Sequence, residues 1–203
     1  VEVQGIHGMI EFGNRLMTGV VGIIAIAVVL LVLHTISGRR ALIDALWFAV
    51  GGLAGAAVAF VLVSLTDFPA FPVASAVLLI AVIAAAVHSV RTTPARRDLV
   101  LLAWLVLIGV VAQALVGGIT VLTGLNPFIV GFHYTSSLLL VCITAAFLVR
   151  LATPEGPRER AVPTWFAIVT HITGLALAVT ILFGVLTTGS GPHSGDADVL
   201  RRG

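Results

Sequence analysis

Charge, lysine and cysteine are what this sequence has least of. Only 10% of its 203 residues are charged, none is Lys, and 59% are hydrophobic. A soluble globular domain carries about 25% charged residues. The composition therefore excludes a soluble fold and indicates a chain whose main solvent is lipid.

The single cysteine, Cys142, lies inside an apolar run. One thiol can form neither an internal disulfide nor a cysteine-based metal site, so we interpret it as a small packing residue. The basic residues are all Arg and lie mainly in short turns between apolar runs. That distribution is a topology signal, and we expect no nucleic-acid partner.

Apolar runs of about 20 residues, the length needed to cross a bilayer, occupy most of the chain. A helix satisfies its own backbone hydrogen bonds in lipid, whereas an open strand does not. We therefore predict an all-α, polytopic membrane helix bundle that forms a single membrane domain over residues 1–203, with an outer tail at 189–203. The six predicted spans are 16–36, 42–65, 72–90, 99–122, 128–149 and 165–188.

The connections between these spans alternate in charge. The first, third and fifth carry arginines, and the second and fourth carry none. By the positive-inside rule the arginine-bearing turns are cytoplasmic, so both termini face outward. Arg201 and Arg202 run against the rule but lie well beyond the last span. We expect a multi-pass protein of the bacterial plasma membrane.

Polar side chains inside a membrane helix are costly, so their positions point to candidate sites. Glu11, Asn14 and Arg15 share one helical face at the outer end of the first span. Helix capping and anchoring at the interface explain this cluster as readily as function does.

The fourth span carries Gln113, Gly117 and Thr120 at i, i+4 and i+7, again on one face. A glutamine at this depth needs a hydrogen-bond partner, and glycine lets another helix or a flat ligand approach the backbone closely. Helix packing and ligand binding both remain open for this face.

His133 lies about five residues into the fifth span, roughly 8 Å below the outer surface by helical rise. It could ligate haem iron, carry a proton or be a satisfied core residue. His171 lies nearer mid-membrane, and His34 and His88 near cytoplasmic ends are interpreted as interfacial. Asp44, also near a cytoplasmic end, has no evident role.

A Gly/Ser/Pro-rich tract follows the last span and contains His193 and Asp196. Its composition is that of an ordinary loop. The predicted topology places both residues on the same side as Glu11, Gln113 and His133. The outer half of the bundle is therefore the candidate site.

Three motifs, taken in order, resemble haem A synthase of the actinobacterial type. They are residues 10–15 (IEFGNR), residues 113–125 (QALVGGITVLTGL) followed by His133, and residues 188–196 (TGSGPHSGD). The resemblance implies a membrane oxidoreductase that oxidises the C8 methyl of haem O to a formyl group, giving haem A.

The same resemblance implies roles for single residues. Glu11 is the catalytic carboxylate and His133 a haem-iron ligand, and haem b is expected as a cofactor. The implied partners are haem O, lipid, haem O synthase and cytochrome oxidase assembly proteins, with a homo-oligomer left open. Residues expected around the haem are Asn14, Arg15, Gln113, Gly117 and Thr120, with weaker candidates at His193 and Asp196.

The sequence departs from the family pattern in three ways. Asn14 stands where most members have His, so axial ligation would depend on His133. The family's first helix and most of its C-terminal half, which holds haem b between two histidines, do not appear in these residues. Residues of about 41–90 form a helical hairpin with no counterpart that we recognise. We therefore expect a partial chain or a variant.

Two other classes of function fit the residues. A haem-binding electron-transfer protein would use His133 without oxidising the haem. A transporter or assembly factor would use the outer polar cluster as a substrate path, with glycine-rich faces that permit helix movement.

Overall fold

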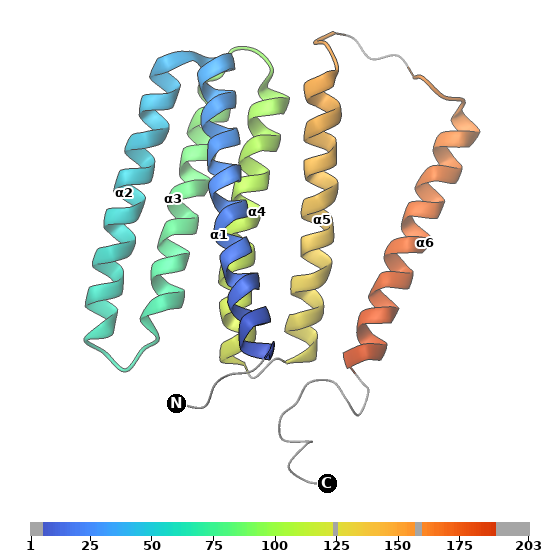
Figure 1. Ribbon diagram of the computed structural model, residues 1–203. Coiled ribbons are helices and arrows are strands. Elements are labelled where there is room, and N and C mark those ends of the chain that lie inside the picture. The colour runs from blue at the N-terminus through green and yellow to red at the C-terminus, as the bar shows by residue number, and fades with distance from the viewer. Residues whose placement is uncertain (1–5, 124–125, 157–159, 190–203) are drawn as a thin grey trace.

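The computed structural model describes residues 6–123, 126–156 and 160–189, and the secondary structure within these ranges is entirely helical (Figure 1). The all-α prediction is thus confirmed. The elements are α1 (Ile6–Val32), a π-helical turn η1 (Leu33–Ser37), α2 (Gly38–Ser64), α3 (Ala70–Thr92), α4 (Arg97–Leu122), α5 (Pro127–Ala152) and α6 (Thr164–Gly189).

Local sequence signals explain several helix ends. Asn126 caps α5, because its side-chain oxygen accepts a hydrogen bond from the backbone N–H of Phe128 at 3.0 Å. Pro127 follows as the first helical residue, where its missing N–H costs nothing. Between α2 and α3, Thr66 and Pro69 lie in the turn that separates the predicted spans 42–65 and 72–90.

The connection between α1 and α2 is tighter than the sequence suggested. The helical conformation continues through η1 and resumes at Gly38, which has φ 84° and ψ −179°. Only glycine adopts this backbone conformation without strain. Figure 1 shows that α1 and α2 run in opposite directions on either side of this residue.

Five described stretches are long and apolar enough to cross a membrane, with residues 16–64 counted as one stretch of 49 residues. That stretch contains both α1 and α2 and doubles back at Gly38. Counting the two helices separately gives the six crossings expected from the sequence. The number of crossings and the side on which each terminus lies stay predictions.

Helix α4 lies at the centre of the bundle and packs against α1, α3 and α5. Its buried residues include Val100, Ala103 and Trp104, and those of α1 include Val29. Most other large apolar side chains are exposed, as expected for a surface that faces lipid. Helix α6 packs along α5 and has no buried residue in its described span.

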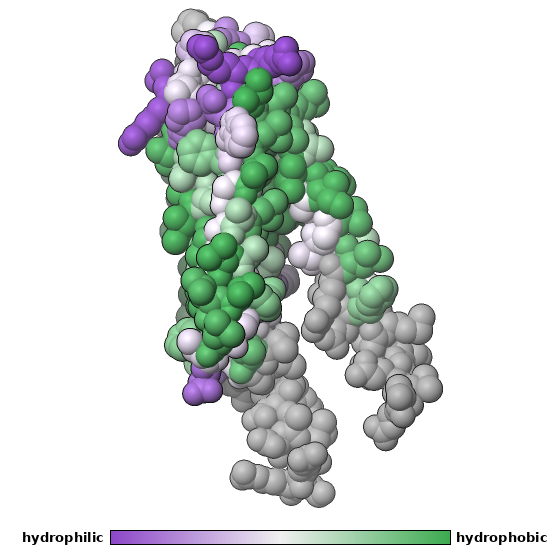
Figure 2. Space-filling view, turned by 90° about the vertical axis from the view of Figure 1, so that its left-hand side faces the viewer, coloured by the Kyte–Doolittle hydropathy of each residue, from purple (hydrophilic) through white to green (hydrophobic). Residues whose placement is uncertain are grey.

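The arginine side chains that the structure describes lie at one end of the bundle, where Figure 2 shows a hydrophilic surface above a largely hydrophobic body. At this end Arg96 donates to the backbone oxygen of Arg150 at 2.6 Å, and Asp98 lies 3.6 Å from Arg96 and 4.0 Å from Arg150. These contacts join the α3–α4 turn to the end of α5. The start of α1 and the end of α6 lie at the opposite end (Figure 1).

Candidate functional site between α4 and α5

The polar residues of α4 and α5 meet across the interface between these helices. The side-chain amide of Gln113 donates a hydrogen bond to the Ser136 hydroxyl at 2.7 Å. That hydroxyl in turn lies 2.6 Å from the backbone oxygen of Phe132, one helical turn earlier. Ser136 therefore fixes the orientation of the Gln113 amide from the facing helix.

One turn along α4, Gly117 faces the imidazole of His133. A Cβ built at Gly117 would lie 3.6 Å from His133 Cε1 and 3.9 Å from Nε2. The missing side chain thus lets the imidazole ring approach the α4 backbone. The sequence placed Gln113 and Gly117 on one face, and the structure shows that His133 packs against this face.

Two polar atoms in this interface are buried without a hydrogen-bond partner in the described residues. They are Oε1 of Gln113 and Nδ1 of His133. A buried polar atom left unpaired costs about 1–3 kcal/mol, and such an atom in a native protein calls for an explanation.

Thr120 has a different role from its neighbours on the same face. It is buried, and its hydroxyl donates to the backbone oxygen of Val116 at 2.8 Å. This bond satisfies the hydroxyl within α4. The structure thus explains Thr120 by packing alone, and its expected contact with haem stays a prediction.

The remaining predicted site residues cannot be placed against this interface. Glu11, Asn14 and Arg15 belong to the backbone of α1, but their side chains lie outside the described part of the structure. His193 and Asp196 also lie outside the described residues. His171 is exposed on α6, where Nδ1 lies 2.6 Å from the backbone oxygen of Ala167.

Sequence reasoning missed Ser136 and the pairing of Asp44 with His88. Ser136 follows His133 by three residues, a spacing that places both on one face of α5 and could have indicated a shared site. Nothing in the sequence could pair Asp44 with His88, since they lie on different helices. Their Oδ2 and Nε2 atoms are 3.5 Å apart.

The chain matches the family model of COX15-CtaA, described as cytochrome oxidase assembly protein, over residues 73–192. This segment covers more than half of the chain. The chain belongs to this family. No curated protein and no solved structure gave a match. The family is the haem A synthase family and is associated with the handling of haem.

The matched segment includes Gln113, Gly117, Thr120 and His133, so the α4–α5 interface lies within the family's own region. It also includes residues 73–90, which we had assigned to a hairpin without a family counterpart. That assignment is wrong for these residues, because most of α3 belongs to the match. The motif at residues 10–15 lies outside the match and remains a resemblance.

One side chain of the α4–α5 interface has the chemistry of a haem ligand. His133 offers an imidazole whose Nε2 edge faces a glycine and whose Nδ1 is buried and unpaired. Imidazole is a common axial ligand of haem iron. The donor set therefore fits iron ligation by His133.

Proposed function

We propose that this protein is a haem A synthase-like membrane oxidoreductase that converts haem O to haem A by oxidising the C8 methyl to a formyl group. Family membership supports a role in cytochrome oxidase assembly and haem A synthesis. One observation links the proposal to a particular site. The His133 imidazole packs against Gly117, next to the Gln113 amide that is hydrogen-bonded to Ser136.

In this proposal His133 supplies the iron ligand for the haem O substrate. The hydrogen bond from Gln113 to Ser136 leaves the amide oxygen Oε1 free to accept a hydrogen bond. Gly117 leaves space for the imidazole against α4. Together the three residues bind and orient the substrate in a membrane environment from which water is largely excluded.

Glu11 is the proposed catalytic carboxylate, as the family resemblance implies. A carboxylate beside a reacting methyl could accept protons or stabilise developing positive charge. When bound, haem b would supply electron transfer.

The test is to express the full-length gene that encodes this chain, with a source of haem O, in a membrane that lacks haem A synthase, and to analyse the extracted haems. We expect haem A from the wild type and none from Glu11→Ala or His133→Ala. His171→Ala is the control, because its imidazole is exposed on α6, away from the proposed site. Persistent haem O with intact wild-type protein would reject the enzymatic step.

A haem-binding protein without oxidation chemistry is the second candidate, since His133 alone suffices for a haem ligand. Reduced-minus-oxidised spectra of the purified chain distinguish the two functions. A haem spectrum that depends on His133, together with unchanged haem O, would support binding without catalysis. No haem spectrum at all would remove haem from both candidates.

A further inference from the structure

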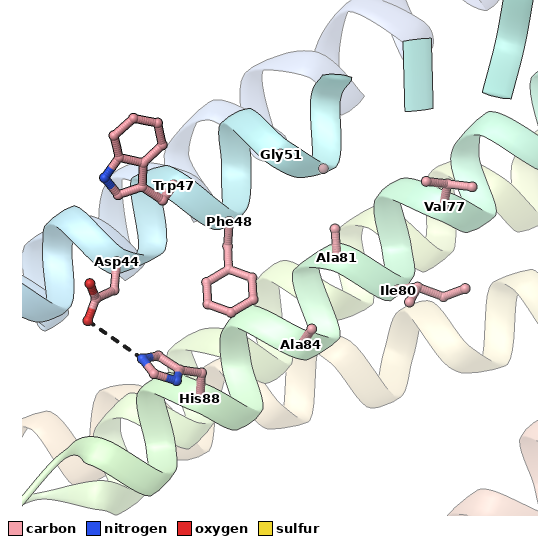
Figure 3. Close-up of a pocket in the computed structure, with 10 residues that line it drawn as sticks. Asp44, Trp47, Phe48, Gly51, Val77, Ile80, Ala81, Ala84 and His88 are labelled. Atoms are coloured by element: carbon pink, nitrogen blue, oxygen red, sulfur yellow. Dashed lines mark ion pairs between the residues drawn. The ribbon is translucent and has the colours of Figure 1, made fainter. Parts of the chain in front are cut away.

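A groove on the surface of the α2–α3 pair carries an acid and a base that the proposed function does not use (Figure 3). Its volume is about 630 Å³. Asp44 and His88 lie at one end, and the remainder is lined mostly by apolar and small residues.

Glycine and alanine residues determine the depth of this groove. A Cβ built at Gly52 would lie 2.6 Å from Cβ of Ala81, so α2 and α3 pack closely at this point. A Cβ built at the neighbouring Gly51 would meet nothing within 4 Å. Gly51 therefore contributes open space to the groove, whereas Gly52 holds its two walls together.

Asp44 and His88 form the polar end. Oδ2 of Asp44 lies 3.5 Å from Nε2 of His88, and each side chain is 42% exposed. The ring of Phe48 lies 5.5 Å from the imidazole, and Figure 3 shows the two rings next to each other. An aromatic ring and an acid–base pair thus line the same opening.

The polar end lies near the arginine-rich end of the bundle. By helical rise, His88 is roughly 6 Å from the end of α3, and Val77 lies roughly 16 Å deeper along the same helix. The groove therefore leads from the level of the lipid headgroups toward the middle of the membrane. Its occupant would have a polar head and an apolar tail.

The acid–base pair limits the chemistry of that head. An imidazole can accept or donate a hydrogen bond according to its protonation state, and a carboxylate accepts. The pair therefore suits a ligand whose polar head group carries carbonyl oxygens when oxidised and hydroxyl groups when reduced. A lipid phosphate is anionic, so the Asp44 carboxylate disfavours it, whereas a quinone is uncharged.

We propose that this groove binds a membrane quinone, with its ring at Asp44 and His88 and its isoprenoid tail along the groove toward Val77. A ring carbonyl of the quinone accepts a hydrogen bond from the His88 imidazole, and a ring hydroxyl of the reduced form donates one to the Asp44 carboxylate. Phe48 and Trp47 line the same groove. The site is separate from the α4–α5 interface and does not depend on haem binding there.

Tryptophan fluorescence tests the proposal, because Trp47 lines the groove and quinones quench indole emission. The full chain in phosphatidylcholine nanodiscs is titrated with decylubiquinone, a short-tailed benzoquinone. We expect saturable quenching with a stoichiometry near one quinone per chain. Trp47→Phe should lose the saturable part and retain the linear quenching that arises from quinone dissolved in the lipid.

Variants of the groove sharpen the test. His88→Leu should weaken decylubiquinone binding by about tenfold, the effect of losing one good hydrogen bond. Asp44→Asn should not weaken it, because a carboxylate cannot donate a hydrogen bond to a quinone carbonyl. Gly51→Leu should abolish saturation by filling the groove without disturbing the helix pair. Gly19→Leu is the matched control, since a Cβ there also meets nothing within 4 Å, and it should bind as the wild type does.

Three results would overturn the proposal. One is quenching that never saturates, which means partition into lipid only. Another is equal competition by decanol, which means that the groove recognises only a tail. The third is displacement by phosphatidylglycerol, which means an anionic lipid site. His133→Ala should still bind quinone. The quinone proposal can therefore be rejected or supported independently of the haem proposal.

Discussion

At the scale of single residues, unpaired atoms distinguish the α4–α5 interface from ordinary helix packing. Three buried side-chain atoms in the described residues lack a hydrogen-bond partner, and two of them belong to Gln113 and His133. The third, Nε1 of Trp104, lies in the core on the same helix. Two of the three unpaired atoms thus belong to the α4–α5 interface.

Replacement of Gln113 by Leu should therefore separate stability from function. The change removes an unpaired buried oxygen, and an apolar residue of similar size in its place is expected to be nearly neutral or stabilising. We expect an unchanged or raised melting temperature in detergent, together with reduced haem binding. If the melting temperature and haem binding both fell, Gln113 would have a packing role only.

Ser136→Ala provides the comparison for this variant. It leaves the Gln113 amide buried without its partner, which costs on the order of 1–3 kcal/mol. Its melting temperature should therefore fall where that of Gln113→Leu does not. Circular dichroism at the helical band measures both variants under the same conditions.

At the scale of helices, close contacts between small residues hold the bundle together where lipid supplies no hydrophobic force between helices. Helices α2 and α3 approach most closely at Gly52 and Ala81. The periodicity of α2 did not reveal which of its glycines makes this contact, because Gly51 and Gly52 are adjacent and both lie in an apolar run. Only the rotation of the helix about its axis distinguishes them.

Gly51→Ala and Gly52→Ala should therefore have opposite effects. Alanine gains about 1 kcal/mol over glycine in an exposed helix interior, so Gly51→Ala should be neutral or stabilising. At Gly52 the added methyl would lie 2.6 Å from Ala81 and force the helices apart. Overpacking of this kind costs about 1–3 kcal/mol.

Unfolding of both variants in mixed detergent micelles, followed by circular dichroism, measures the difference between them. The wild type should lie between the two variants. Equal stabilities for Gly51→Ala and Gly52→Ala would show that the α2–α3 contact is looser than the structure describes.

At the scale of the whole molecule, the distribution of charge determines the predicted orientation. The arginines of the first, third and fifth connections gather at one end, and the α2–α3 turn with Asp67 lies at the other. The positive-inside rule then places the arginine-rich end in the cytoplasm. The α4–α5 polar contacts and the quinone groove lie toward opposite ends of the bundle.

Cysteine labelling tests this orientation. In a Cys142→Ala background, Asp67→Cys and Ala95→Cys each place one thiol in an exposed turn at opposite ends of the bundle. A membrane-impermeant maleimide should label Asp67→Cys in right-side-out vesicles, and Ala95→Cys only after permeabilisation. The reverse pattern would invert the topology, and equal labelling of both would argue against an odd number of crossings between them.

The sequence by itself determined the helical class, the approximate ends of the helices and the alternation of charge. These are local properties, since each apolar run must satisfy its own backbone in lipid and each turn carries its own arginines. The same local reasoning placed Gln113, Gly117 and Thr120 on one face of a helix.

Only the tertiary structure decided which faces meet. Ser136 as the partner of Gln113, the packing of His133 on Gly117, and the Asp44–His88 pair all depend on helix rotation and register. When a helix is apolar on every side, its sequence shows little periodicity in hydrophobicity. The rotation of the helix about its axis then cannot be predicted from the sequence. For this reason the sequence located the residues of the candidate site, and the packing of α4 against α5 determined which of them act together.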